Sequence, residues 1–161
     1  DGINQSNTWY FEKHLNWKGI LIEPLENEYK ELIINRSKKN YFYNCALVGS
    51  KKIKSLKLIK KKLESKIIKN EESNSKVIDV NSQTLTSILE KIKLSKDIDF
   101  FSLDVMGFES EVLRGINFKK FKFKFILIAT YNNNVLKYLH NKNYKFVKKL
   151  THHDYLFKYK Y

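Results

Sequence analysis

Residues 98–105 read Ile-Asp-Phe-Phe-Ser-Leu-Asp-Val, and this apolar run is the strongest indication of how the chain folds. Apolar residues occupy neighbouring positions rather than alternate ones, which is typical of a strand in a sheet that is covered on both faces. The run ends on a carboxylate, Asp104, and Gly107 follows in a predicted turn. Residues 19–23 (Gly-Ile-Leu-Ile-Glu) repeat this pattern and end on Glu23. We therefore expect two buried strands that each present an acid at one end.

Helical and strand-like patterns alternate along the rest of the chain. Apolar residues at helical spacing predict helices over residues 8–15, 26–36, 85–92, 109–114 and 135–141. Short apolar or β-branched runs predict further strands over residues 41–48, 77–80 and 123–129. Two final runs, 144–150 and 155–159, predict an antiparallel hairpin at a sheet edge. This order is typical of an α/β fold: a doubly wound, mostly parallel sheet in one domain, residues 1–161, with a C-terminal antiparallel hairpin.

Local signals refine the boundaries of these elements. Ser82 or Thr84 is expected to cap the helix that begins near residue 85, because a hydroxyl oxygen can accept a free N–H at a helix start. Asn16 is expected to end the first helix. Residues 49–75 are rich in Lys and Ser with scattered apolar residues, and we predict either a hairpin or an irregular insertion there.

The formal net charge of +14 raises the question of nucleic-acid binding, because clustered cations bind phosphates by releasing counterions. The cations are 29 lysines and two arginines, whereas arginine is the residue usually chosen for phosphate and base recognition. The densest cluster has no aromatic residue for base stacking; it comprises Lys51, Lys52, Lys54, Lys57, Lys60, Lys61 and Lys62. We expect a solvated surface and no specific nucleic-acid partner, and keep a Lys-rich nucleic-acid-binding protein as the third alternative for the function.

Cysteine and histidine usage narrows the chemistry further. The single Cys45 cannot form an internal disulfide and is expected to pack within an apolar strand, which fits a cytoplasmic location. No apolar run approaches the ~20 residues that span a bilayer, so no membrane span is expected. His152 and His153, next to Asp154, resemble metal ligands, but adjacent side chains diverge on an extended backbone, and we expect no metal.

Ligands of open α/β sheets bind at the carboxyl ends of the strands, which makes three positions candidates for a site. Asp1 and Gly2 fit the end of a glycine-containing turn, although such a pair also forms ordinary turns. Glu23 could accept both hydroxyls of a ribose, or instead cap the next helix. Asp104 could face a ligand, or instead form hydrogen bonds within its own turn.

Taken together, two long blocks of sequence resemble the FkbM-type methyltransferases in order and spacing. The resemblance covers nearly the whole chain and is carried by residues 1–8, 11–13, 17–24, 35–36, 44–46, 84–85, 98–105, 107–109, 112–113, 115, 144 and 154–157. It implies an S-adenosylmethionine-dependent methyltransferase on a doubly wound sheet, acting on a hydroxyl of a sugar, a glycan or another small polar acceptor.

The resemblance also implies residue roles. Asp104 would face the sulfonium and the acceptor as the catalytic residue. The cofactor contacts would be Asp1 and Gly2 on the methionine part, Glu23 on the ribose, Pro24, Ala46 and Leu47 at the adenine, and Asp104 itself. A carboxylate suits a cationic ligand, and the remaining work of the protein is alignment and deprotonation of the acceptor.

Three departures from the family pattern qualify this expectation. Met106 and Ala129 stand where the pattern has acids, which makes a catalytically weakened binding module the second hypothesis. The pattern also has an apolar strand and the rest of the glycine loop before Asp1. We therefore expect this domain to lack its first strand, which would lie centrally between the strands that hold Glu23 and Asp104. The identity of the acceptor and the oligomeric state do not follow from the sequence.

Overall fold

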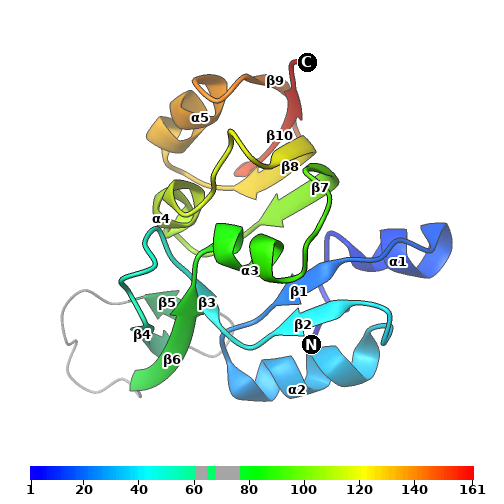
Figure 1. Ribbon diagram of the computed structural model, residues 1–161, viewed down its shortest axis with the longest axis vertical. Coiled ribbons are helices and arrows are strands. Elements are labelled where there is room, and N and C mark those ends of the chain that lie inside the picture. The colour runs from blue at the N-terminus through cyan, green and yellow to red at the C-terminus, as the bar shows by residue number, and fades with distance from the viewer. Residues whose placement is uncertain (61–64, 68–76) are drawn as a thin grey trace.

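The computed structural model describes residues 1–60, 65–67 and 77–161 (Figure 1). Its helices are α1 Trp9–Leu15, α2 Glu26–Asn35, α3 Leu85–Lys91, α4 Glu109–Arg114 and α5 Asn133–His140. Its strands are β1 Ile20–Ile22, β2 Tyr41–Tyr43, β3 Ala46–Leu47, β4 Ser55–Lys60, β5 Ser65–Ile67, β6 Val77–Gln83, β7 Asp97–Leu103, β8 Lys122–Ala129, β9 Tyr144–Lys149 and β10 Asp154–Tyr159. The predicted alternation of helices and strands is confirmed.

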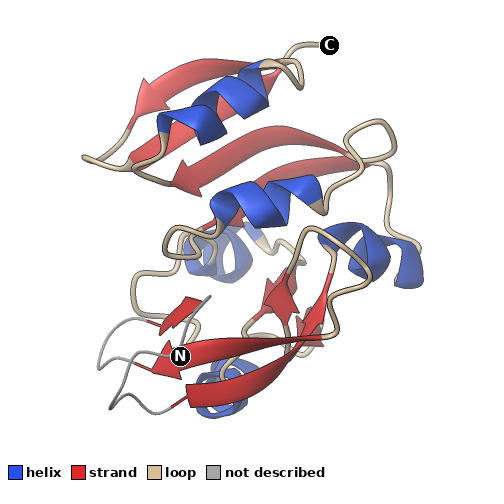
Figure 2. Ribbon diagram, turned by 90° about the vertical axis from the view of Figure 1, so that its left-hand side faces the viewer, coloured by secondary structure: helices blue, strands red, loops and turns tan. Residues whose placement is uncertain are grey.

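The described strands form three sheets rather than the single doubly wound sheet that the pattern suggested. β1 pairs with β2 in parallel. β7 and β8 are parallel, and β8, β10 and β9 continue that sheet in antiparallel fashion, so the predicted C-terminal hairpin is confirmed. The third sheet has the order β3-β6-β4-β5. Figures 1 and 2 show the sheet of β7 to β10 lying apart from the sheet of β3 to β6.

The strand predicted over residues 41–48 is divided between two sheets. The side-chain amide of Asn44 donates hydrogen bonds to the carbonyl oxygens of Glu23 (2.9 Å) and Pro24 (3.2 Å), which holds the chain in a turn after β2. The chain then pairs again as β3, parallel to β6. This turn depends on an amide that reaches a distant backbone, so the strand propensity of residues 41–48 could not reveal it.

The lysine-rich segment contains strands. β4 pairs in antiparallel fashion with both β5 and β6, which confirms the hairpin alternative for this segment. Residues 61–64 and 68–76, including Lys61 and Lys62 of the predicted lysine cluster, lie outside the described residues. β6 also extends to Gln83, beyond the predicted end at residue 80, because β4 and β3 pair with its two edges.

The main core lies between the sheet of β7 to β10 and the helices α3, α4 and α5. Its fully buried side chains include Leu89, Leu113, Ile126, Leu139 and Tyr144. The helix α3 begins at a cap formed by Thr84, whose hydroxyl oxygen accepts the N–H of Ser87 at 3.2 Å, whereas Ser82 lies within β6. Of the two predicted caps, Thr84 is therefore the correct one. Asn16 ends α1 in a left-handed conformation, as predicted.

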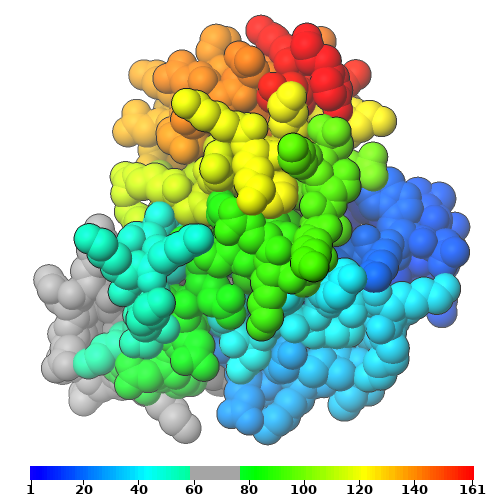
Figure 3. Space-filling model, viewed as in Figure 1, coloured from blue at the N-terminus to red at the C-terminus, as the bar shows by residue number. Residues whose placement is uncertain are grey.

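Two contacts join the N-terminal segments to the β7 sheet. Phe11 of α1 packs edge-on against Phe100 of β7, with ring centroids 5.3 Å apart. The side-chain amide of Asn7 donates a hydrogen bond to the hydroxyl of Ser102 at 3.1 Å. The space-filling view shows the N-terminal segments, in blue and cyan, lying against the central green segments (Figure 3). Both contacts position the first residues of the chain near the end of β7.

A close backbone contact joins β3 to α4. A side chain at Gly115, the residue that ends α4, would collide with the carbonyl oxygen of Val48. The buried hydroxyl of Thr86 donates to the carbonyl of Gly115 at 2.7 Å and accepts the N–H of Asn117 at 2.8 Å. These contacts fix α3, α4 and the end of β3 against one another.

Candidate functional site

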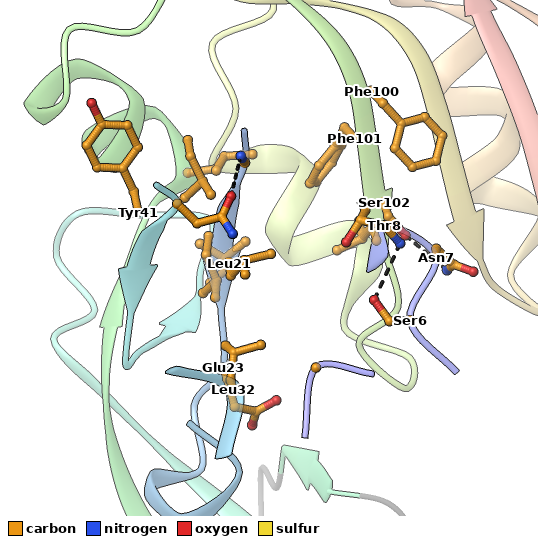
Figure 4. Close-up of a pocket in the computed structure, with 18 of the residues that line it drawn as sticks. Ser6, Asn7, Thr8, Leu21, Glu23, Leu32, Tyr41, Phe100, Phe101 and Ser102 are labelled. Carbon is orange, nitrogen blue, oxygen red and sulfur yellow. Dashed lines mark hydrogen bonds between the residues drawn. The ribbon is translucent and has the colours of Figure 1, made fainter. Parts of the chain in front are cut away.

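A cavity of about 1220 Å³ lies between β1 and β7. Figure 4 shows Leu21 and Glu23 on one side of it, and Phe100, Phe101 and Ser102 on the other. Among the described strands, β1 pairs only with β2 and β7 pairs only with β8, so each strand has an unpaired edge. The walls are mainly apolar between the strands. They become polar near the residues that follow β1 and β7, Glu23 and Asp104.

All the residues that the sequence suggested as cofactor contacts line this one cavity; they are Asp1, Gly2, Glu23, Pro24, Ala46, Leu47 and Asp104. They come from four separate parts of the chain. The structure thus brings together residues that are more than 100 positions apart in the sequence, such as Gly2 and Asp104.

The first residues form a tight polar turn at the cavity. The carboxylate oxygen Oδ1 of Asp1 accepts the backbone N–H groups of Ile3 (2.8 Å) and Asn4 (2.9 Å). Gly2 has a φ of 78°, a conformation that favours glycine, and a side chain there would collide with Leu32 of α2. The turn therefore lies closely against α2, and only glycine fits at its second position.

Arg36, a buried arginine at the end of α2, holds this turn in place. Its Nη1 donates to the carbonyl of Gly2 at 3.0 Å and to the hydroxyl of Ser6 at 3.2 Å, and its Nε donates to Oε2 of Glu12 at 2.8 Å. Glu12 also accepts the backbone N–H of Ser37 (2.7 Å) and the side-chain amide of Asn40 (2.6 Å). Burial alone would raise the pKa of Glu12, but these donors stabilise the carboxylate and the net effect is a lowered pKa.

Sequence reasoning missed this role of Glu12 and Arg36. The pair was noticed only as part of the family pattern, and its function in holding the turn depends on contacts across 24 residues. One signal was available in the composition. Arg36 is one of two arginines among 29 lysines, and arginine is the cation best suited to several simultaneous hydrogen bonds.

Glu23 lies directly after β1, at the cavity. Its Oε1 accepts the backbone N–H of Leu25 at 2.9 Å, and its own N–H donates to the carbonyl of Tyr43 at 3.1 Å. Leu25 is the N-cap residue of α2 and no side chain caps that helix, so Glu23 holds the chain just before α2 but is not the N-cap that the alternative interpretation proposed. The same side chain lines the cavity, and the two roles are compatible because a carboxylate has two acceptor oxygens.

Asp104 lies just beyond the end of β7, beside two other acids. Although Asp104 is exposed at the surface, partial desolvation of its carboxyl group raises its pKa above the ordinary value of 3.8; the carboxylates of Asp154 and Glu109 raise it further, whereas the imidazole of His153 opposes the shift. Asp154 and His153 therefore lie close enough to Asp104 to affect its charge. No local pattern in the sequence places Asp154 beside Asp104, because Asp154 belongs to the C-terminal hairpin.

Glu109 holds the turn after Asp104. It is buried, its Oε1 accepts the backbone N–H of Gly107 at 2.6 Å, and its Oε2 accepts the hydroxyl of Thr130 at 3.2 Å. Met106, within this turn, has a φ of 49° and an exposed side chain. Glu109 is thus a positioning residue for the turn that carries Asp104 and Met106, and it was not singled out from the sequence.

Other candidates have simpler environments. Cys45 is buried, and its burial raises the pKa of the thiol to about 11, so the thiol stays protonated at neutral pH. Lys51 of the lysine cluster pairs with Glu90 at 3.5 Å. In the described parts of the chain, no group of three or more His, Cys, Asp or Glu residues is arranged to hold a metal ion. No helix in those parts is long and apolar enough to cross a membrane.

Comparison with known proteins identifies the family of the chain. A family model described as the Methyltransferase FkbM domain matches residues 1–146, which include the whole cavity lining. No curated protein and no solved structure matches the chain. The matched range is most of the 161 residues and contains both strand ends that carry acids. The chain therefore belongs to the FkbM family of methyltransferases.

Proposed function

We propose that this protein is an S-adenosylmethionine-dependent methyltransferase that methylates a hydroxyl of a sugar or another small polar acceptor. The observation that carries the proposal is the convergence of Gly2, Glu23 and Asp104 on one cavity at the ends of β1 and β7. Ligands of α/β proteins bind at this position. Family membership supports the methyltransferase chemistry.

The residues at the cavity fit the parts of this cofactor. Glu23 supplies a carboxylate for the two ribose hydroxyls, and Ala46 and Leu47 supply an apolar surface for an adenine. Asp104 supplies a negative charge for the sulfonium. When bound, the cofactor supplies an electrophilic methyl group on a cationic sulfur. The protein's own work is to orient the two reactants, and Asp104 also receives the proton of the acceptor hydroxyl.

We also propose that the functional sheet contains a further strand between β1 and β7. Each of these strands has an unpaired edge, and the apolar walls between them suit a strand with apolar residues on both faces. Such a strand would join the two parallel pairs into one doubly wound sheet and leave the cofactor at its carboxyl edge. Hydrogen exchange of the natural full-length polypeptide tests this, because pairing would protect the amides of Ile22 and Phe101, whose neighbours along each strand direct their backbone groups to β2 and β8; rapid exchange at both would contradict it.

Calorimetric titration of the full-length polypeptide with S-adenosylmethionine and S-adenosylhomocysteine tests the cofactor proposal. Glu23→Ala should weaken both affinities by ~10- to 100-fold, since it removes hydrogen bonds from a charged acceptor. Glu26→Ala is the matched control, because Glu26 is an exposed acid three residues away that pairs with Lys30. No binding to the unmodified protein, or equal losses in both variants, would contradict the proposal.

A second candidate, a cofactor-binding module with little or no turnover, is favoured by Met106 and Ala129. Met106 is exposed on the turn after Asp104, where its thioether can neither accept a proton nor bind a cation strongly. Methyl transfer to a panel of hydroxyl acceptors, measured with labelled cofactor, separates the two candidates. Methyl transfer by the natural protein supports the enzyme. Cofactor binding without methyl transfer, together with a gain of transfer in Met106→Glu, supports the module.

A further inference from the structure

An exposed aromatic stack lies at the end of the β7 sheet, outside the cavity. Tyr131, immediately after β8 and Thr130, stacks on His153 with ring centroids 5.1 Å apart and planes 24° from parallel. The phenol oxygen of Tyr131 and Nδ1 of His153 are 3.4 Å apart. Tyr131 is nevertheless 78% exposed. These contacts, with a tilted contact to His152 at 5.9 Å between ring centroids, orient the ring while leaving most of its surface open to solvent, so the ring is available to a ligand.

Strand register places this stack beside Asp104. Leu103 of β7 pairs with Ile128 of β8, so Asp104 is level with Ala129, and Ala129 pairs with Asp154 of β10. Residues in register on adjacent strands point to the same face and lie about 4.8 Å apart. Asp104, Ala129 and Asp154 therefore form a row across the three strands, with an acid at each end and the small side chain of Ala129 between them.

The acid at each end of this row is held in place. Oδ2 of Asp154 accepts the hydroxyl of Thr151 at 2.5 Å, and the same hydroxyl oxygen accepts the backbone N–H of Asp154 at 3.2 Å. The turn after Asp104 is fixed by Glu109 through Gly107 and Thr130. Thr130 also donates its N–H to the carbonyl of His153 at 2.8 Å, which couples the segment of Tyr131 to the hairpin turn. The stack and the row are therefore parts of one ordered surface.

The charge of this surface differs from that of the protein as a whole. The chain carries a formal charge of +14, yet the carboxylates of Asp154 and Glu109 lie close enough to Asp104 to raise its pKa. Such a local excess of carboxylates repels phosphates and carboxylates. Carboxylates accept hydrogen bonds from neutral hydroxyls well, and an aromatic face packs against the C–H face of a saturated ring.

We propose that Tyr131, stacked on His153, and the carboxylates of Asp104 and Asp154 form the acceptor site for a neutral ring polyol, such as an uncharged hexopyranoside. The C–H face of the ring lies on Tyr131, and its hydroxyls donate to the two carboxylates. This inference rests on the proposed methyltransferase function, because Asp104 then belongs to both the cofactor edge and the acceptor site. Tyr131 and Asp154 are specificity residues, and His153 positions the Tyr131 ring.

Saturation-transfer NMR of the full-length polypeptide tests this proposal, with methyl β-D-glucopyranoside, methyl β-D-galactopyranoside and methyl α-D-mannopyranoside as probes. At least one should show transfer to its ring protons, and methyl β-D-glucuronoside should show much less. Tyr131→Ala should weaken binding of the probe by severalfold, up to roughly tenfold, because the aromatic face is lost. Tyr131→Phe keeps the aromatic face and should therefore bind the probe as well as the natural protein does. Tyr161→Ala is the matched control, since Tyr161 is 81% exposed at the other end of β10.

Several results would overturn the proposal. These are no transfer to any neutral probe, stronger transfer to the glucuronoside, or equal losses in the Tyr131 and Tyr161 variants. Asp154→Asn supplies a second measurement, because it keeps the side-chain shape and should reduce the preference for neutral over charged probes. Calorimetry with S-adenosylmethionine separates the two proposals: Tyr131→Ala should leave cofactor affinity unchanged, and cofactor binding without polyol binding would contradict only the acceptor site.

Discussion

The guanidinium of Arg36 donates from Nε to Oε2 of Glu12 at 2.8 Å, and the arginine side chain is only 3% exposed. The same guanidinium reaches the carbonyl of Gly2, so this ion pair connects α1, α2 and the turn that lines the cavity. Removing one partner of a buried ion pair leaves the other charge buried without a counter-charge. The loss of folding free energy then exceeds the net stabilisation that the intact pair provides.

Glu12→Gln should therefore lower the free energy of unfolding by about 3 kcal/mol at pH 7. The pKa of Glu12 is lowered in the fold, so its contribution is complete above the unfolded value of 4.5 and is lost as the pH falls through the folded pKa. Urea unfolding at pH 7 and at pH 3 should show a large difference between the variant and the natural protein only at pH 7. Glu26→Gln, on the exposed face of α2, should change stability little; a pH-independent loss in Glu12→Gln would contradict this account.

The raised pKa of Asp104 predicts a pH dependence of cofactor binding. A sulfonium is favoured by the ionised carboxylate, so affinity for S-adenosylmethionine should rise with pH from about 4 until Asp104 is fully ionised, on the order of tenfold. S-adenosylhomocysteine has a neutral thioether and should show a much smaller dependence. Calorimetry with both ligands over this pH range measures the difference. Asp104→Asn should abolish the difference in pH dependence between the two ligands. Identical pH dependences of affinity for the two ligands in the natural protein would place Asp104 away from the sulfur.

Tyr144 stabilises the core through its hydroxyl as well as its ring. It is fully buried, and its Oη accepts the backbone N–H of Phe123 at 3.0 Å. Tyr144→Phe leaves that buried N–H without a partner and should cost about 1–3 kcal/mol in thermal or denaturant unfolding. Tyr161→Phe, at an exposed site, is the control. A loss below 0.5 kcal/mol, which is within the usual range for a surface substitution, would show that the N–H finds another acceptor.

Cys45 should be inert in the folded protein. Its thiol is buried, and that burial raises its pKa to about 11, so little thiolate forms at pH 8. A coloured disulfide reagent at pH 8 should react with Cys45 slowly in the native protein and within minutes after denaturation. Rapid reaction of the native protein would mean that β3 opens readily from its sheet.

The sequence predicted features that depend on neighbouring residues. Thr84 as a helix cap, Asn16 as a helix end, and the acids Glu23 and Asp104 at strand ends all follow from patterns a few residues long. The division of residues 41–48 between two sheets does not follow from such a local pattern, because it depends on the side-chain amide of Asn44 reaching backbone carbonyls about 20 residues away.

The same distinction applies to the site. Gly2, Glu23 and Asp104 could be proposed because each follows or precedes a recognisable element, and the family pattern gave their order. The contacts of Arg36 with Gly2 and of Glu109 with Thr130 could not be proposed from the sequence, since they join segments that are 34 and 21 residues apart. The proximity of Asp154 to Asp104 depends on the register of three strands, which no local pattern specifies.

Gly115 limits how this protein can change. It lies against the carbonyl of Val48 and sets the separation between the end of β3, which holds Leu47, and α4, the helix that follows Asp104. Any side chain there would act as a wedge that moves the end of β3 and α4 apart. A substitution at this position is therefore expected to disturb the proposed site without altering any of the residues proposed to contact a ligand.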